Sequence, residues 1–116
     1  MLTQNIFKGD VRANEQLNLI VLHTVWLREH NRVARFLQRM NPFWDDERLY
    51  QEARRITTAE YQHIVYNEWL PIILGNEFMT SFGLWPLTKG FSTDYRDDFD
   101  PRITNEFATA AFRYGI

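Results

Sequence analysis

Cysteine is absent from the 116-residue sequence, and neither sign of charge dominates. Without cysteine the chain can form no disulfide scaffold and offers no thiolate to a metal ion. The formal net charge of -2 argues against nucleic acid as the main partner. Long apolar runs are also lacking, because the best candidate, 17–27, is too short to span a bilayer and charges follow it. No signal peptide is expected, since the first residues have neither a basic nor a long apolar region.

The chain is instead rich in bulky apolar side chains. Hydrophobic residues make up 45% of the sequence and aromatic residues 16%, so we expect large side chains to pack between the elements. At this length the chain forms at most one domain, with enough material for a modest core.

A long helix is predicted over about 14–40. Asn14 is a good N-cap, and Glu15 would then lie in the first turn, where the helix dipole favours a carboxylate. Residues 17–27 are apolar on nearly every face, which predicts that this end of the helix is buried all round. Further along, the apolar residues narrow to one stripe at alternating steps of four and three. The members of that stripe are Trp26, His30, Val33, Leu37 and Met40.

The remaining elements complete an all-α prediction. Asp45 or Asp46 can cap a second helix over about 47–69, and Gly75 is expected to stop its short apolar continuation. Scattered glycine, proline and aromatic residues predict an irregular loop over 76–99, and Asp100–Pro101 has the pattern of a third helix start. The expected fold class is therefore all-α, with two long helices, an irregular loop and a third helix.

Two histidine patterns could in principle bind metal. Glu60 and His63 have the spacing of half a carboxylate-bridged di-iron site, but the sequence holds no second copy of the motif. His23 and His30 are seven residues apart, which is too far for the usual pairing on one metal ion. Structural histidines, bonded to the backbone or to carboxylates, are therefore favoured. The aspartates near residues 94–100 are expected to form a solvated face rather than a calcium site.

The order of short motifs along the chain resembles the animal haem peroxidases, the family of myeloperoxidase, peroxidasin and peroxinectin. Residues 9–16, GDVRANEQ, are similar to the Gly-Asp-x-Arg-x-x-Glu segment of that family. Further similar motifs are spread over almost the whole chain. They lie at 22–24, 27–32, 41–42, 44–54, 70–75, 100–103 and 112–115. The resemblance implies that the expected helices form part of a larger, mainly helical catalytic domain.

This resemblance implies roles for three residues. Arg12 matches the distal arginine over the haem, where a fixed cation would lower the barrier to charge separation across the peroxide O–O bond. Glu15 matches the glutamate that forms an ester with a haem methyl group, and Arg113 matches an arginine close to a haem propionate. The implied cofactor is haem b. The implied activity is that of a haem-dependent peroxidase, which reduces hydrogen peroxide while oxidising a small-molecule donor.

Several residues of the family have no match in this sequence. The distal histidine, the aspartate haem ester and the main calcium ligands belong to an earlier segment of the family pattern, which has no counterpart here. The proximal histidine is expected at position 116, where this chain has Ile116, and an aliphatic side chain cannot ligate iron. Residues 1–116 are therefore expected to be a partial peroxidase domain with little activity of its own.

Two further expectations follow from the resemblance. The family is secreted or membrane-attached, which implies an extracellular location. The partners implied are the remainder of the peroxidase domain and, through apolar surface left exposed, further copies of the chain. The alternative is a non-catalytic helical scaffold that binds no haem.

Overall fold

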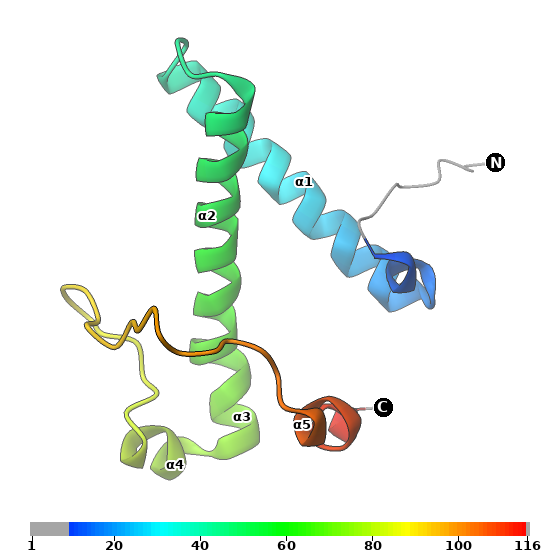
Figure 1. Cartoon of the computed structure of the whole chain (residues 1–116), viewed down its shortest axis with the longest axis vertical. Coiled ribbons are helices and arrows are strands. Elements are labelled where there is room, and N and C mark those ends of the chain that lie inside the picture. Colours follow the sequence, from blue (N-terminus) through cyan, green and yellow to red (C-terminus); the bar gives the residue numbers. More distant parts are fainter. Residues whose placement is uncertain (1–9, 116) are drawn as a thin grey trace. The chain divides into compact units, whose positions relative to one another are not determined.

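The structure is a computed structural model that describes residues 10–115, and the described residues are helices joined by turns and loops (Figure 1). No strand occurs in this part of the chain, so the predicted all-α class is confirmed. The chain divides after Pro86 into two units, which are described in turn. None of the described helices combines the length and the hydropathy that a bilayer crossing requires.

The first unit begins with two helical elements instead of one. A short 3-10 helix, η1 (Val11–Asn14), precedes the long helix α1 (Leu17–Met40). The predicted start at Asn14 is wrong, because Gln16 has an extended backbone (φ -149°, ψ 161°) that separates the two elements. Glu15 therefore lies before α1 and not in its first turn.

The second long helix follows the prediction closely. In α2 (Asp46–Ile64), the Asp45 carboxylate caps the helix by accepting from the Arg48 backbone N–H at 2.8 Å. Acidic residues in the first turn suit the helix dipole. The helix continues through a π-helical turn, η2 (Val65–Trp69), into α3 (Leu70–Leu74). The π-helical turn comes just before Pro71, whose ring has no N–H and crowds the preceding turn.

The predicted irregular loop begins later than expected. Gly75 ends α3 with φ 79°, a left-handed backbone that favours glycine, so the predicted stop is confirmed. The chain then forms another short helix, α4 (Asn76–Ser81), in which the Met79 backbone N–H donates to the Gly75 carbonyl at 3.1 Å. The side chain of Met79 is fully buried, and it anchors α4 to the rest of the first unit.

Helices α1 and α2 form a hairpin that is closed at only one end. They meet near the connection at 41–45 and spread apart towards the start of α1 (Figure 1). The closed end buries Val33, Leu49 and Ala53. On the same side, His30 lies against Tyr50 with ring centroids 5.1 Å apart. The predicted stripe thus faces α2, except for Met40, which is exposed.

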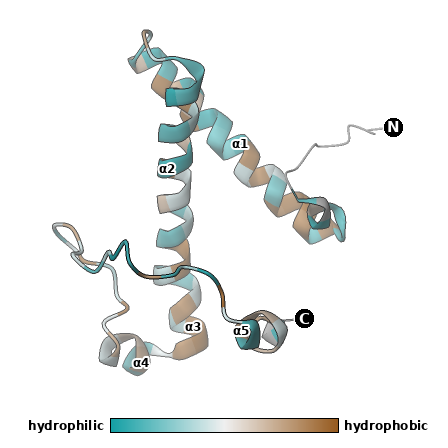
Figure 2. Cartoon of the chain, viewed as in Figure 1, coloured by the Kyte–Doolittle hydropathy of each residue, from teal (hydrophilic) through white to brown (hydrophobic). Residues whose placement is uncertain are grey.

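The first half of α1 is not buried. Leu17 is 72% exposed, and about half of the surface of Val21, Leu22, Val25 and Leu27 is in contact with solvent. Leu19, Ile20 and Trp26 are partly buried. Figure 2 shows hydrophobic residues concentrated in this half of α1 and in α3. The prediction of burial all round is therefore wrong within the first unit, because α2 diverges from this part of α1 and only η1 and a few side chains of α2 contact it.

The second unit begins at Leu87 and contains two short elements, α5 (Asn105–Thr109) and η3 (Ala111–Gly115). Thr104 caps α5, because its hydroxyl accepts from the Phe107 backbone N–H at 3.4 Å. The predicted helix start at Asp100–Pro101 is wrong: the Asp100 carboxylate binds Arg102, and residues 101–104 have no regular structure. The aspartates near 94–100 are exposed, as predicted.

Candidate functional site

Arg12 lies in η1, and one carboxylate holds both its backbone and its side chain. Asp10 Oδ1 accepts from the Arg12 backbone N–H at 2.9 Å and from Nε at 3.0 Å. Asp10 Oδ2 accepts from Nη2 at 2.6 Å. The side chain of Arg12 remains 79% exposed. Its guanidinium is therefore fixed in direction while most of its surface is free for contact.

The electrostatics of this pair follow from the short hydrogen bonds. The Arg12 guanidinium and backbone N–H stabilise the ionised carboxylate, which lowers the pKa of Asp10 from 3.8 to about 2. The same pairing, with a smaller contribution from the nearby Glu15 carboxylate, raises the pKa of Arg12 above its ordinary value. Both groups are therefore charged near neutral pH.

Glu15 lies directly after η1. Its backbone N–H donates to the Arg12 carbonyl at 3.0 Å, and its side chain is exposed. Ala13, between the two candidate residues, is buried where η1 contacts α1. The structure therefore brings Arg12 and Glu15 together on one short turn that is anchored at the start of α1.

Arg113 belongs to the second unit. It lies in η3, where its backbone N–H donates to the Ala110 carbonyl at 3.0 Å. Its side chain is exposed and forms no ion pair with the residues that the structure describes. Two aromatic side chains near it in the sequence, Phe107 and Phe112, contact each other with ring centroids 6.1 Å apart. The guanidinium of Arg113 is thus available to an anion. Ile116, the predicted proximal position, lies outside the described residues.

The histidines have structural contacts, as predicted. His23 Nδ1 is 2.7 Å from the Leu19 carbonyl within α1. His30 Nε2 is 3.2 Å from the Tyr50 carbonyl in α2. Because a carbonyl oxygen only accepts, the nitrogen facing it carries the proton in each case. His30 therefore joins the two long helices.

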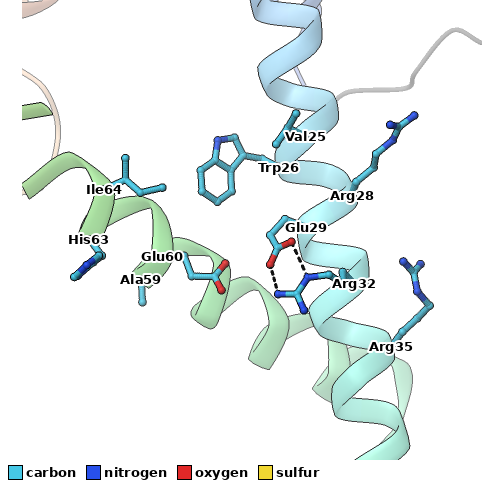
Figure 3. A pocket seen from close by; sticks show the side chains of 10 residues that line it. All are labelled: Val25, Trp26, Arg28, Glu29, Arg32, Arg35, Ala59, Glu60, His63 and Ile64. Carbon is cyan, nitrogen blue, oxygen red and sulfur yellow. Dashed lines mark hydrogen bonds and ion pairs between the residues drawn. The ribbon is translucent and has the colours of Figure 1, made fainter. Parts of the chain in front are cut away.

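An open groove of about 1080 Å³ lies between α1 and α2 where the hairpin widens. Figure 3 shows Trp26, Glu29 and Arg32 pointing from α1 towards α2, while Arg28 and Arg35 point away from it. Glu29 accepts from Arg32 at 2.8 Å and 2.5 Å. The groove is therefore lined by apolar side chains, such as Val25 and Ile64, together with the Glu29–Arg32 ion pair.

The groove brings together no recognised metal-binding group among the described residues. Glu60 and His63 both line it from α2, but the described residues contain no group of three or more potential ligands that could hold a metal ion. The di-iron interpretation of this pair, already weak in the sequence, gains nothing from the geometry. Glu60 instead faces the Arg32 cation across the groove.

One residue of the site was missed by the sequence analysis. Asp10 was treated only as part of a motif, yet it makes more hydrogen bonds to Arg12 than any other described residue. The available signal was the spacing: an aspartate two residues before an arginine, with an extended backbone, can cap a turn and pair with the side chain of the same arginine.

Comparison with known proteins gives a consistent result. A family described as animal haem peroxidase matches residues 2–116. The chorion peroxidase of Drosophila melanogaster is 54% identical over 107 residues, which cover 92% of this chain and 13% of that protein. The peroxidasin of the same species is 47% identical over 92% of this chain and 6% of its own length. The human peroxidasin homolog is 49% identical, with shares of 92% and 7%. The chain thus spans only a small part of each relative's length.

Proposed function

The chain belongs to the animal haem peroxidase family, and we propose from this that it is one portion of the catalytic domain of a haem-dependent peroxidase. That enzyme would reduce hydrogen peroxide while oxidising a small-molecule donor. The observation that carries the proposal is the match over almost the whole chain, because it includes the segment with Arg12 and Glu15. We assign residues 1–116 to the stretch that runs from the distal arginine to just before the proximal histidine position.

The charges of the candidate residues suit the edge of a haem group. Arg113 has an exposed guanidinium with no ion-pair partner among the described residues, and haem propionates are anionic partners that arginine binds well. The exposed carboxylate of Glu15 is accessible for an ester with a haem methyl group. Neither role requires burial within this chain. We assign the iron ligand to no described residue, and we propose no calcium site.

Arg12 would act on the peroxide. When bound, haem supplies the redox chemistry by which peroxide is reduced. A guanidinium fixed beside the peroxide would stabilise the negative charge that develops on the leaving oxygen. Arginine suits this role because it does not deprotonate in proteins, and Asp10 raises its pKa further.

The remainder of the peroxidase domain is the partner that this proposal requires. The relatives are many times longer than the matched stretch, and the first half of α1 exposes apolar side chains that a larger domain would cover. We also propose an extracellular location, which the name chorion peroxidase supports for that relative.

The test exchanges the matched segment of Drosophila chorion peroxidase for the corresponding residues of this chain up to Gly115, so that the hybrid keeps its own residue at the position of Ile116. We expect the hybrid protein to bind haem, with a Soret band, and to oxidise guaiacol. Arg12→Ala should lower kcat by about 100- to 1000-fold, as losses of single transition-state contacts do. Arg102→Ala is the matched control, because Arg102 has the same local pairing in the second unit.

Two results would contradict the proposal. A hybrid that binds haem and keeps full activity with Arg12→Ala would remove the role of Arg12. A hybrid that shows no Soret band would favour the alternative, a non-catalytic helical scaffold that binds no haem. The specific observation behind that alternative is that Arg12 already has a carboxylate partner, and that its pairing with Asp10 is the ordinary pairing of a capped turn.

A further inference from the structure

The pair of Asp10 and Arg12, here called the distal clamp, has a geometry that restricts the guanidinium. Both oxygens of Asp10 are used, one for Nε and one for Nη2, while Oδ1 also receives the Arg12 backbone N–H. A carboxylate that binds two planar donors of one guanidinium fixes its plane as well as its distance. Because the backbone N–H binds to the same carboxylate, the side chain is fixed relative to η1.

The clamp leaves the guanidinium with donors to spare. A guanidinium has five N–H bonds, and the carboxylate occupies Nε–H and one hydrogen on Nη2. Both hydrogens of Nη1 and the second hydrogen of Nη2 remain. These point away from Asp10, because they lie on the side of the guanidinium opposite to the carboxylate. The clamped arginine can therefore still donate two or more hydrogen bonds to a small polar ligand.

We propose that Asp10 is a positioning residue, which holds the Nη1 side of Arg12 in a fixed direction for contact with the peroxide. This inference rests on the proposed function, in which Arg12 faces that substrate. Asp10 itself touches no reacting atom. Its contribution is to reduce the number of rotamers that a long, exposed side chain would otherwise sample, so that less ordering is needed when the substrate binds.

The second unit contains a matched control for this clamp. Asp100 and Arg102 repeat the geometry: the Asp100 carboxylate accepts from the Arg102 backbone N–H at 3.0 Å, from Nε at 2.9 Å and from Nη2 at 2.6 Å. The sequence Asp-x-Arg does not by itself form such a pair, because Arg96 follows Asp94 at the same spacing but pairs with Asp98. A position beside the candidate residue Glu15 is what distinguishes the distal clamp.

The first test measures the clamp without haem. In the full chain, NMR should detect the Arg12 Nε–H as a slowly exchanging signal, because it is bound to a carboxylate. Asp10→Asn retains one oxygen that can cap the Arg12 backbone N–H, but it loses the second oxygen and the charge. We expect solvent exchange at Nε–H to accelerate at least about tenfold, while the backbone amide of Arg12 keeps its shift. Asp100→Asn should leave the Arg12 signals unchanged.

The second test uses the haem-containing hybrid with chorion peroxidase. Asp10→Asn should lower kcat for peroxide by about 10- to 100-fold, in line with the cost of a misplaced catalytic group, whereas KM for the donor should not change. Combined with Arg12→Ala, it should cause no additional loss, since a positioning residue has no effect once its target is gone. Asp100→Asn should retain full activity.

The outcomes separate the two proposals. If Arg12→Ala lowers activity but Asp10→Asn does not, the positioning role is wrong and the proposed function stands. If Arg12→Ala has no effect, the proposed function is wrong and the positioning role falls with it. An additive loss in the double variant would show that Asp10 acts independently of Arg12, which would also overturn the inference.

Discussion

The two halves of α1 differ both in hydropathy and in surroundings. In the second half, Val33 is buried and His30 contacts Tyr50 across the hairpin. In the first half, Leu22 is 55% exposed and Val25 is 53% exposed. The hydropathy of the first half is the higher of the two (Figure 2). The less buried half of the helix is thus the more hydrophobic one.

This difference shows that an apolar pattern indicates that a helix has packing partners. The pattern does not indicate where those partners lie. The stripe of the second half has a width that one neighbouring helix can cover, and α2 covers it. The first half is apolar on nearly all faces, which requires neighbours on several sides. Within the first unit, only η1 and a few residues of α2, such as Tyr61 against Trp26, contact this half. We propose that the remainder of the peroxidase domain covers the apolar surface that these contacts leave exposed.

The largest expected effect comes from shortening a side chain in the closed half. Leu49 is 6% exposed, and Leu49→Ala would leave a cavity between α1 and α2. We expect a loss of about 2–4 kcal/mol in the free energy of unfolding, measured by urea denaturation and far-UV circular dichroism. The same change at Leu22 should cost less than about 0.5 kcal/mol, because that side chain is half exposed. Equal losses at the two sites would contradict the comparison.

The next effect concerns association of the chain with itself. The exposed first half of α1 should bind other copies through its apolar side chains, so that sedimentation velocity detects oligomers at micromolar concentration. Val25→Glu places a charge in this surface, and we expect it to weaken association by about tenfold or more. Phe43→Glu is the control, because Phe43 is 99% exposed but lies in the loop at the closed end of the hairpin, away from the first half of α1. A monomeric wild-type chain with cooperative melting would refute this prediction.

Much of the fold could be predicted because its signals are local. The cap at Asp45 and the stop at Gly75 depend on residues within a few positions, and both are observed. The errors also have local causes. Asp100, which could cap a helix, instead pairs with Arg102, and the last α-helix begins only after Thr104. The first helix begins later than predicted because the extended backbone at Gln16 separates η1 from α1.

The candidate site could be predicted in composition but not in geometry. The sequence places Arg12 and Glu15 three residues apart, and the structure confirms only that they share a turn. Their roles towards haem stay a prediction. The reason is physical, since the exposure of both side chains depends on segments that would cover the start of α1. Arg113 lies in the second unit, and sequence alone gives no distance between it and Arg12.

A smaller effect is expected from the hydrogen bond that joins the two long helices. His30→Ala removes the donor to the Tyr50 carbonyl and should cost about 0.5–1.5 kcal/mol in unfolding free energy. His23→Ala is the matched control, because His23 bonds only to the Leu19 carbonyl within its own helix. We expect the control to lose less, as measured by urea denaturation. A larger loss at His23 than at His30 would contradict the prediction that the hydrogen bond between His30 and Tyr50 stabilises the hairpin.

The smallest effect concerns the ion pair at the boundary between the two halves. Pairing with Arg32 lowers the pKa of Glu29 below its ordinary value of 4.5. A carboxylate whose pKa is depressed in the folded state adds stability above its unfolded pKa, and that stability is lost as the pH falls through the folded pKa. Arg32→Gln should therefore reduce the loss of stability between neutral pH and about pH 3, in urea denaturations at several pH values. Arg55→Gln, which removes a longer 3.8 Å contact with Glu52, should change this pH dependence less.

Because Glu60 also faces Arg32 from α2, an unchanged pH dependence in Arg32→Gln would mean that neither carboxylate contributes. Apolar contact alone would then define where the hairpin closes.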